Sequence, residues 1–511
     1  MKLINKLFKI IFSKLTFAIL LLILQVIVLY VLFMLFYEYI VYLFGGFTFL
    51  SILLVLYIVN SNENSSYKIA WIIPILIFPV VGIAFYCFCH LQISIYKVKK
   101  ALVKEQSISK KYLTSNKEIS SNLEKEDKST YNLINYINSA SNNSVYNPSD
   151  IKYFKCGEDM FSSLINDLKN AKKYIFLEYF ILEKGYMWDT ILEILKEKVK
   201  ENVEVRVMYD GMCSLMMLPY NYKDELLKYN IKCKMFFPIK LELSLHQNNR
   251  DHRKICVIDG DIAYTGGINI ADEYINKKKR FGYWKDTAIR INGDCVNSYT
   301  VMFIEMWNID GIDKCQYSKY INNSDVINNN GYIISYGDNP LNNKQIGKRV
   351  YMDIINTAKD YIDIITPYLI LDEELLNSLI YASNRGVKVR IIMPHIPDKK
   401  LVYYLGRSYY KDLISNGISI YEYKKGFTHA KMFISDDIKA VVGTINLDYR
   451  SLYLHFECAS YIYKNNVISS IKKDYDNTIL ESIKIDKNDV DKYNIFKRII
   501  GKILRLISPL M

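Results

Sequence analysis

Histidine is scarce in this chain, and several familiar catalytic signatures are missing. Only six of the 511 residues are histidines. The sequence has no Gly-x4-Gly-Lys-Ser/Thr loop and no His-Glu-x-x-His pair, which argues against a P-loop nucleotide site and against that class of zinc enzyme. Nine cysteines occur without the paired spacing of a metal site. We therefore expect reduced, mostly buried cysteines, and neither a metal nor another cofactor.

Charge is nearly absent from a long N-terminal stretch. Between Leu15 and Val59 the only charged residue is Glu38. That length is enough for two membrane spans of roughly 20 residues each. A further uncharged run extends from Ala70 to His90. The pattern predicts a helical transmembrane anchor over residues 1–95 and a multi-pass location in the cell membrane. Lysines flank both ends of the anchor, so the positive-inside tendency leaves its orientation open.

One short pattern is present twice in the remainder of the chain. Both copies read His-x-Lys-x4-Asp-x6-Gly-x2-Asn, with identical spacings. The first copy consists of His252, Lys254, Asp259, Gly266 and Asn269, and the second of His429, Lys431, Asp436, Gly443 and Asn446. A single His-x-Lys in a strand is usually a solvated surface feature. Two matching copies, which together use two of only six histidines, indicate that these histidines belong to a functional site.

The spacing has a physical interpretation. Ile255, Val257 and Ile258 predict a buried strand that begins just after the first motif histidine. Side chains alternate along a strand, so the histidine and lysine of each copy share a face and the aspartate turns away from it. We therefore expect a structural role for Asp259 and Asp436. The Asp-Gly-Asp step after the first strand predicts a turn and a hairpin partner.

The residue types of the motif suit phosphoryl chemistry. A neutral histidine can attack phosphorus or accept a proton near pH 7, and a lysine ammonium beside it attracts an anion. The glycine and asparagine end the returning strand, where backbone can approach a ligand closely. The net charge of +13 also favours an anionic partner.

The two motif copies belong to an internal duplication. Ala171–Ile175 matches Ala358–Ile362 at an offset of 187, and Val203–Val207 matches Val387–Ile391 at an offset of 184. The motif histidines are 177 residues apart. Such near-constant offsets, with alternating strand and helix patterns, predict two α/β halves, each a sheet flanked by helices. Two similar lobes with facing motifs would form one site containing both histidines.

The segments outside the lobes are polar or amphipathic. Residues 96–149 are rich in Lys, Glu, Ser and Asn and predict a polar linker with one helix at most. Residues 486–511 predict a basic amphipathic C-terminal helix. It would either lie on an anionic membrane or pack on the catalytic body. Its apolar positions at helical spacing are Phe496, Ile499, Ile500, Ile503, Leu504 and Ile507.

With its paired motifs the chain resembles the phospholipase D superfamily, and with its anchor it resembles bacterial cardiolipin synthases. Further pieces that resemble this branch are Asn269–Tyr274, Trp284–Thr287, Ile396–Lys399, Phe427–Lys431 and Asn446–Ser451. The resemblance implies an α/β fold of two duplicated phospholipase D-like lobes, each a mixed β-sheet flanked by helices. We place these lobes at residues 150–325 and 326–485, after the N-terminal transmembrane segment and the linker.

The resemblance also implies a mechanism. One motif histidine attacks the phosphorus of phosphatidylglycerol, and the hydroxyl of a second phosphatidylglycerol then takes the phosphatidyl group. The other histidine serves as general acid and base. Lys254, Lys431, Asn269 and Asn446 would hold the non-bridging oxygens.

The family orients each motif histidine with a downstream carboxylate. The candidates are Asp286, 34 residues after His252, and Glu457, 28 residues after His429. The motif alone does not show which histidine is the nucleophile, and His252 is our prediction.

Other functions remain open at this point. A phospholipase D-type hydrolase would pass the phosphatidyl group to water. A nuclease of the same superfamily is disfavoured by the predicted anchor, so no nucleic-acid partner is expected; the expected partners are phosphatidylglycerol and anionic membrane lipids. A catalytically inactive membrane scaffold would have no need of two His/Lys pairs.

Overall fold

The computed structural model describes most of the chain and divides it into two compact units. The described residues are 14–35, 40–90, 93–113, 116–148, 150–213, 217–219, 221–237, 249–322 and 330–510. One unit comprises Met1–Ile93 with Leu506–Met511, and the other comprises Ser94–Arg505. Glu38, the only charge in the first apolar run, lies outside the described residues.

The N-terminal unit is helical. Its helices are α2 (Lys14–Leu35), α3 (Ile40–Asn60), α4 (Ser65–Ile77) and α5 (Pro79–His90). Helices α4 and α5 pack so closely at Gly82 that a Cβ there would lie 2.5 Å from the Ile75 Cα, and only glycine fits at this position. Within the described part of the chain, no helix combines the length and the apolar character needed to cross a membrane. The transmembrane anchor therefore stays a prediction.

The first lobe is a mixed seven-stranded sheet. Its strand order is β1 (Asp150–Phe154), β8 (Ala288–Asn292), β6 (Ile262–Gly266), β5 (Lys254–Ile258), β2 (Tyr174–Tyr179), β3 (Glu204–Asp210) and β4 (Lys232–Phe236). Strands β2, β3 and β4 are parallel, whereas β5, β6, β8 and β1 pair antiparallel. Helices α9 (Gly157–Asn170), α10 (Tyr186–Lys200) and α12 (Tyr222–Leu227) belong to this lobe.

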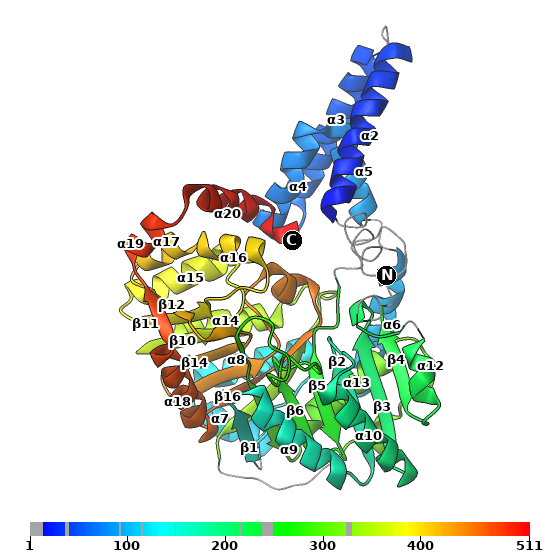
Figure 1. Ribbon diagram of the computed structural model, residues 1–511, viewed down its shortest axis with the longest axis vertical. Helices are drawn as coiled ribbons and strands as arrows, with labels where there is room; N and C mark the ends of the chain where they lie inside the picture. The colour runs from blue at the N-terminus through cyan, green and yellow to red at the C-terminus, as the bar shows by residue number, and fades with distance from the viewer. Residues whose placement is uncertain are drawn as a thin grey trace. The chain divides into compact units, whose positions relative to one another are not determined.

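The second lobe repeats this sheet and adds one strand. Its order is β9 (Tyr332–Asp338), β16 (Glu457–Tyr463), β15 (Lys439–Gly443), β14 (Met432–Ser435), β10 (Tyr361–Ile365), β11 (Lys388–Pro394), β12 (Ser419–Tyr423) and the added β17 (Ser482–Ile485). Its helices include α14 (Ile346–Thr357), α15 (Glu373–Asn384), α16 (Lys400–Arg407), α17 (Tyr410–Ser415) and α18 (Val467–Leu480). The predicted duplication is therefore a duplication of topology, and the lobes stand beside each other in Figure 1.

The two lobes share a core and one strand pair. Helix α13 (Val296–Asn308) is buried along its whole length and contacts both β5 of the first sheet and β9 of the second. Its aromatic side chains stack on the first sheet, with the Phe303 and Phe176 ring centroids 4.4 Å apart. Strand β7 (Tyr283–Lys285) of the first lobe pairs in parallel with β13 (Gly426–Thr428) of the second. This pair joins the lobes beside the second motif histidine.

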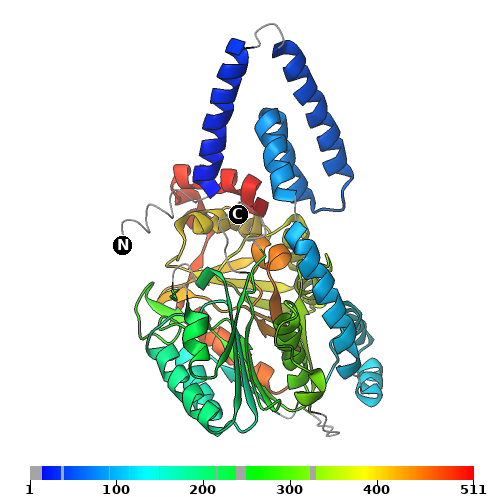
Figure 2. The same ribbon diagram turned by 90° about the vertical axis from the view of Figure 1, so that its right-hand side faces the viewer.

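The expected linker at residues 96–149 is instead a structured part of the catalytic unit. It contains most of α6 (Ile93–Ser109) together with α7 (Lys117–Glu126) and α8 (Lys128–Ser141). Figure 2 shows α6 alongside the body of this unit. The buried Glu105 accepts hydrogen bonds from Lys314 Nζ and from Asn308 Nδ2, at 2.7 and 3.1 Å. The polar composition hid narrow apolar stripes, which in α8 consist of Leu133, Ile134 and Ile137.

Candidate active site

Two hairpins carry the two motifs. Strand β5 begins at Lys254 and pairs with β6, and β14 pairs with β15 in the same way in the second lobe. Both motif histidines lie just before these strands, and each is only 7% exposed. The β-branched and aromatic residues of the strands bury the hairpins in the sheets, so the histidines are held at a fixed edge.

Each motif histidine is held by the backbone of the opposite lobe. The His252 N–H donates to the Phe456 carbonyl of the second lobe at 2.9 Å. The His429 N–H donates to the Lys285 carbonyl of the first lobe at 2.7 Å. These two bonds are equivalent under the duplication, because Phe456 and Lys285 each immediately precede one of the predicted carboxylates. The lobes therefore exchange contacts reciprocally at the site.

The side chains repeat this exchange. His252 Nδ1 lies 2.9 Å from Glu457 Oε1, and His429 Nδ1 lies 2.7 Å from Asp286 Oδ2. Both carboxylates are completely buried. The predicted carboxylates are thus at the histidines, but the pairing expected from the spacing is wrong. Each histidine uses the carboxylate of the other lobe, because that carboxylate lies at the strand edge that meets the histidine across the interface.

The two histidines share one site. His429 and Lys431 of the second lobe both lie close enough to His252 to lower its pKa, although burial is the largest cause of that shift. Lys254 of the first lobe likewise helps to lower the pKa of His429, to about 4, again after the larger effect of burial. Both imidazoles are therefore neutral near pH 7, as nucleophilic and general-base roles require.

The pKa values of the two carboxyl groups are shifted in opposite directions. Burial raises the pKa of Asp286, but His429 and Lys431 outweigh it and hold that pKa below its ordinary value. Burial dominates at Glu457 and raises its pKa well above the ordinary range, with Lys254 opposing the shift. The Asp286–His429 pair therefore favours an ionised carboxylate, which stabilises a proton on His429.

Both motif lysines are buried next to their histidines. Lys254 Nζ donates to the His252 carbonyl, and Lys431 Nζ donates to the His429 carbonyl and lies 2.8 Å from its Nδ1. Burial lowers the pKa of Lys254 to about 8 and that of Lys431 to about 7. An arriving phosphate anion would favour the charged form of both amines, so the pair is suited to meeting negative charge.

The motif asparagines are also buried at the site. Asn269 Oδ1 accepts from the Ile181 N–H at 3.0 Å, and its Nδ2 donates to Tyr274 Oη at 2.7 Å. Asn446 Nδ2 donates to Ser451 Oγ at 3.0 Å. An amide nitrogen carries two N–H groups, so each asparagine can offer a second donor to a phosphate oxygen.

The motif aspartates do not reach the histidines. Asp259 accepts backbone N–H groups from Lys172, Lys173 and Tyr174 at 2.8, 2.6 and 2.9 Å. Asp436 accepts the three equivalent bonds from residues 359–361 of the second lobe, each at 2.9 Å. Both aspartates have positive φ values, 57° and 55°, and end the first strand of their hairpins. Each fixes the start of the neighbouring strand β2 or β10, the structural position that strand alternation predicted.

His455, which lies outside both motif copies, is also at the site. Its ring centroid is 5.3 Å from that of His252, and its side chain is 10% exposed. His252, His455 and Glu457 place potential metal-ligand atoms within 4.8 Å of one another. The Glu457 carboxylate already meets His252, and the cations Arg450 and Lys254 act on His455, so this arrangement fits an anionic substrate better than a metal ion. The sequence feature that could have identified His455 is its position two residues before Glu457, a candidate carboxylate.

The two motif histidines have different aromatic neighbours. Phe180 stands against His252, with ring centroids 4.9 Å apart. His429 is surrounded by Tyr274, Trp284 and Phe427, at centroid distances of 5.6, 5.6 and 5.9 Å. The two halves of the site are therefore not chemically equivalent, despite the shared motif.

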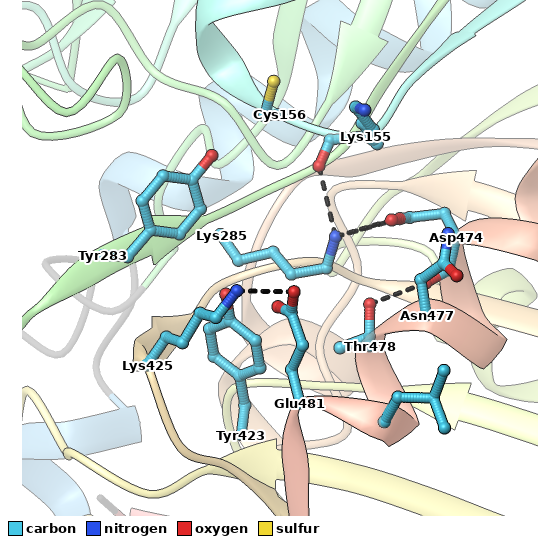
Figure 3. A pocket seen from close by; sticks show the side chains of 11 residues that line it. Lys155, Cys156, Tyr283, Lys285, Tyr423, Lys425, Asp474, Asn477, Thr478 and Glu481 are labelled. Atoms are coloured by element: carbon cyan, nitrogen blue, oxygen red, sulfur yellow. Dashed lines mark hydrogen bonds and ion pairs between the residues drawn. The ribbon is translucent and has the colours of Figure 1, made fainter.

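A separate cavity of about 400 Å³ lies at β7. Its lining includes Tyr283, Lys285, Lys425, Asp474 and Glu481, and none of the motif side chains. Figure 3 shows Lys285 bound to Asp474 and Lys425 bound to Glu481 across it. Alternation along β7 places Trp284 toward His429 and its two neighbours toward the cavity, so the cavity and the histidines lie on opposite faces of this strand.

Comparison with known proteins agrees with this geometry. The family model described as "Cardiolipin synthase, PLD-like domain" matches residues 164–307 and 351–479, and the model described as "Phospholipase D-nuclease N-terminal" matches residues 49–88. An uncharacterized protein of Streptococcus mutans is 45% identical over 89% of this chain and 99% of its own length. Cardiolipin synthase 2 of Staphylococcus epidermidis is 34% identical over 90% of this chain and 95% of its own length.

A solved structure shares the fold. The crystal structure of a phosphatidylserine synthase from Haemophilus influenzae aligns over 74% of this chain and all of its own, with a TM-score of 0.58 and 16% identity. That likeness shows the two-lobed architecture. The family model and the relatives above 30% identity extend it to sequence. The chain therefore belongs to the cardiolipin synthase family of phospholipase D-like phosphatidyltransferases.

Proposed function

We propose that this protein is a cardiolipin synthase that converts two phosphatidylglycerol molecules into cardiolipin and glycerol. The observation that supports the proposal best is the reciprocal exchange across the lobes. Two His/Lys pairs meet in one buried site, and each histidine bears a carboxylate from the opposite lobe. A symmetric arrangement of this kind suits a reaction whose two halves are chemically alike, with one alcohol leaving a phosphodiester and another entering it.

We assign the nucleophile to His252. Its Nε2 attacks phosphorus while the phosphorus–oxygen bond to glycerol breaks, which gives a phosphatidyl-histidine. With the anionic phosphate bound, His429 carries a proton and gives it to the departing glycerol oxygen. It then accepts the proton of the incoming hydroxyl, whose oxygen displaces His252 Nε2 from phosphorus. The pKa values of both histidines are lowered, so His252 is free to attack, and the ionised Asp286 beside His429 favours the proton-carrying role for that histidine.

The remaining motif side chains would bind the phosphate. Lys254, Lys431, Asn269 and Asn446 stabilise the non-bridging oxygens as charge shifts in the transition state. No nucleotide is consumed, because exchanging one phosphodiester for another is close to isoenergetic and the covalent intermediate preserves the bond energy. The proposal therefore requires no cofactor.

The substrates also place the protein at a membrane. The cardiolipin synthase relatives imply phospholipid substrates, and we propose that the apolar N-terminal helices anchor the chain in the bilayer. Anionic lipids would then be both its substrates and its surroundings. A protease-protection assay on membrane vesicles, with a tag at each end of the chain, tests the anchor and its orientation.

The decisive experiment uses the full-length protein in detergent with labelled phosphatidylglycerol, followed by lipid chromatography. Labelled cardiolipin with release of glycerol is the expected result. Phosphatidic acid without cardiolipin would show a hydrolase instead. His252→Ala and His429→Ala should each abolish product, whereas the matched control His395→Ala should not, because its side chain is partly exposed and bonds Glu422 outside the site. Product formation by both motif variants at the parent's rate would show that the motif histidines are not the source of the activity, and absence of product from the parent would leave a scaffold role.

A further inference from the structure

The C-terminal helix α20 (Ile495–Ile507) presents its apolar side to the outside. Seven of its large apolar side chains are between 39% and 72% exposed, whereas Leu504 is half-buried and the only buried residue of the helix is Gly501. The exposed residues are Ile495, Phe496, Ile499, Ile500, Ile503, Leu506 and Ile507. An amphipathic helix that packs on a protein body normally buries this stripe. In α20 the apolar stripe is instead exposed.

The reversal is fixed by specific contacts with the catalytic unit. A Cβ on Gly501 would lie 2.5 Å from the Tyr404 carbonyl of α16, so only glycine allows this approach. Arg505 stacks over the Tyr409 ring at 4.1 Å and pairs with Asp412 at 2.9 Å. The small and charged residues thus dock the helix, and the apolar residues are left on its outer side.

The charge of α20 identifies what its outer side fits. The helix contains four cationic residues and no acidic one. Arg505 is paired with Asp412, whereas Lys497 and Lys502 are exposed. Exposed apolar side chains between cationic ones match the interface of a bilayer that contains anionic lipids, where acyl chains meet negative headgroups. A groove on another protein would supply the apolar contact without this uniform negative charge.

The helix also lies on the element that leads to the site. Its partner α16 carries Leu401, which is 54% exposed, and follows directly from Lys399. Lys399 stacks over the Tyr368 ring at 5.3 Å and acts electrostatically on Asp448 and His455. A surface that contacts α20 and α16 would therefore lie next to the residues around His252.

We propose that the outer face of α20 docks on an anionic lipid surface and holds the active site against it. The inference deepens the proposed function, because it identifies the surface from which a phospholipid would reach the histidines. It concerns a contact that is independent of the N-terminal helices.

The test measures lipid contact directly. Phe496→Trp is prepared in the full-length protein and reconstituted in nanodiscs that contain phosphatidylglycerol, with or without brominated acyl chains. The fluorescence of the parent, which has four tryptophans, is subtracted. We expect the new tryptophan to be quenched by brominated lipid. The matched control is Leu480→Trp on α18, a position that is 85% exposed on another part of the same unit and should not be quenched.

Each outcome decides the inference. Quenching at 496 alone supports it, and a weaker signal after Lys497→Gln with Lys502→Gln, or in zwitterionic discs, supports the charge argument. Absence of quenching at 496 overturns it, and α20 would then face water or a second copy of the chain. Equal quenching at 496 and 480 overturns it as well, since contact would then be nonspecific.

Activity separates this inference from the proposed function. Ile499→Ser with Ile503→Ser should lower transfer in bilayers by about tenfold, because two apolar side chains no longer enter the interface. The same variant should keep parent activity on water-dispersed short-chain phosphatidylglycerol. Equal activity of variant and parent in bilayers would count against docking. A parent without transfer activity would refute the proposed function and leave the fluorescence result valid.

Discussion

The exchange of carboxylates between the lobes makes a prediction that the motif alone cannot make. Asp286 should share the kinetic phenotype of His429, and Glu457 that of His252, although the chain order suggests the reverse. Each carboxylate makes a buried contact of 2.7 to 2.9 Å with its histidine. A hydrogen bond to a charged group contributes about 1.5–3 kcal/mol, so losing it should slow the step that needs that histidine by about 10- to 150-fold.

The assay separates the two histidines with an activated substrate. Phosphatidyl-p-nitrophenol has a leaving group that needs no protonation, so the burst of p-nitrophenol depends on the nucleophile and not on the general acid. If His252 is the nucleophile, His252→Gln and Glu457→Gln should lose the burst. His429→Gln and Asp286→Asn should keep it and be slow only with phosphatidylglycerol.

The refuting result is specific. The reasoning fails if Asp286→Asn loses the burst together with His252→Gln while Glu457→Gln keeps it, because each carboxylate would then serve the histidine of its own lobe. If instead His429→Gln and Asp286→Asn lose the burst together, the exchange stands and only the assignment of the nucleophile changes. The assay thus tests the pairing separately from the chemical roles.

Further predictions concern the motif aspartates, the lysines and metal independence. Asp259→Asn should lower the free energy of unfolding by about 2–3 kcal/mol, since it weakens three bonds to a carboxylate, while the folded fraction keeps its activity; denaturant titration with activity per folded molecule checks this. Lysines lose charge above their pKa, so kcat/KM should fall as pH rises through about 7 to 8, where burial places Lys431 and Lys254. Lys431→Arg should shift this alkaline limb upward, and an unmoved limb would exclude Lys431. Dialysis against EDTA should leave turnover unchanged, and recovery of lost turnover by a metal would contradict the site chemistry.

The spacing of the motif residues is enough to predict much of the site. Alternation along β5 predicted that Lys254 would stay near His252 and that Asp259 would turn away, and the hairpin with its carboxylate bonds agrees. The offsets also predicted two similar halves, and the matched segments do occupy matched positions in the two sheets. These features depend on local geometry, which sequence determines strongly.

Other features depend on contacts between distant segments. Counting residues from His252 to Asp286 gave no indication that β7 would pair with β13 of the other lobe. The Ser- and Asn-rich composition of α7 and α8 masked stripes of only a few apolar residues, including Leu123 and Ile137, which suffice because a large body supplies the other half of the core. His455 lies outside both motif copies, so the motif spacing gave no reason to place it at the site.

The reciprocal contacts also constrain how such a protein could have arisen. A chain with a single motif would hold a histidine whose carboxylate belongs to another molecule, so it could act only where two copies met. Joining the copies in one polypeptide replaces that encounter, which depends on concentration, with an effective concentration set by the connecting segment. Once joined, the two halves could change independently, and the aromatic residues around the two imidazoles do differ.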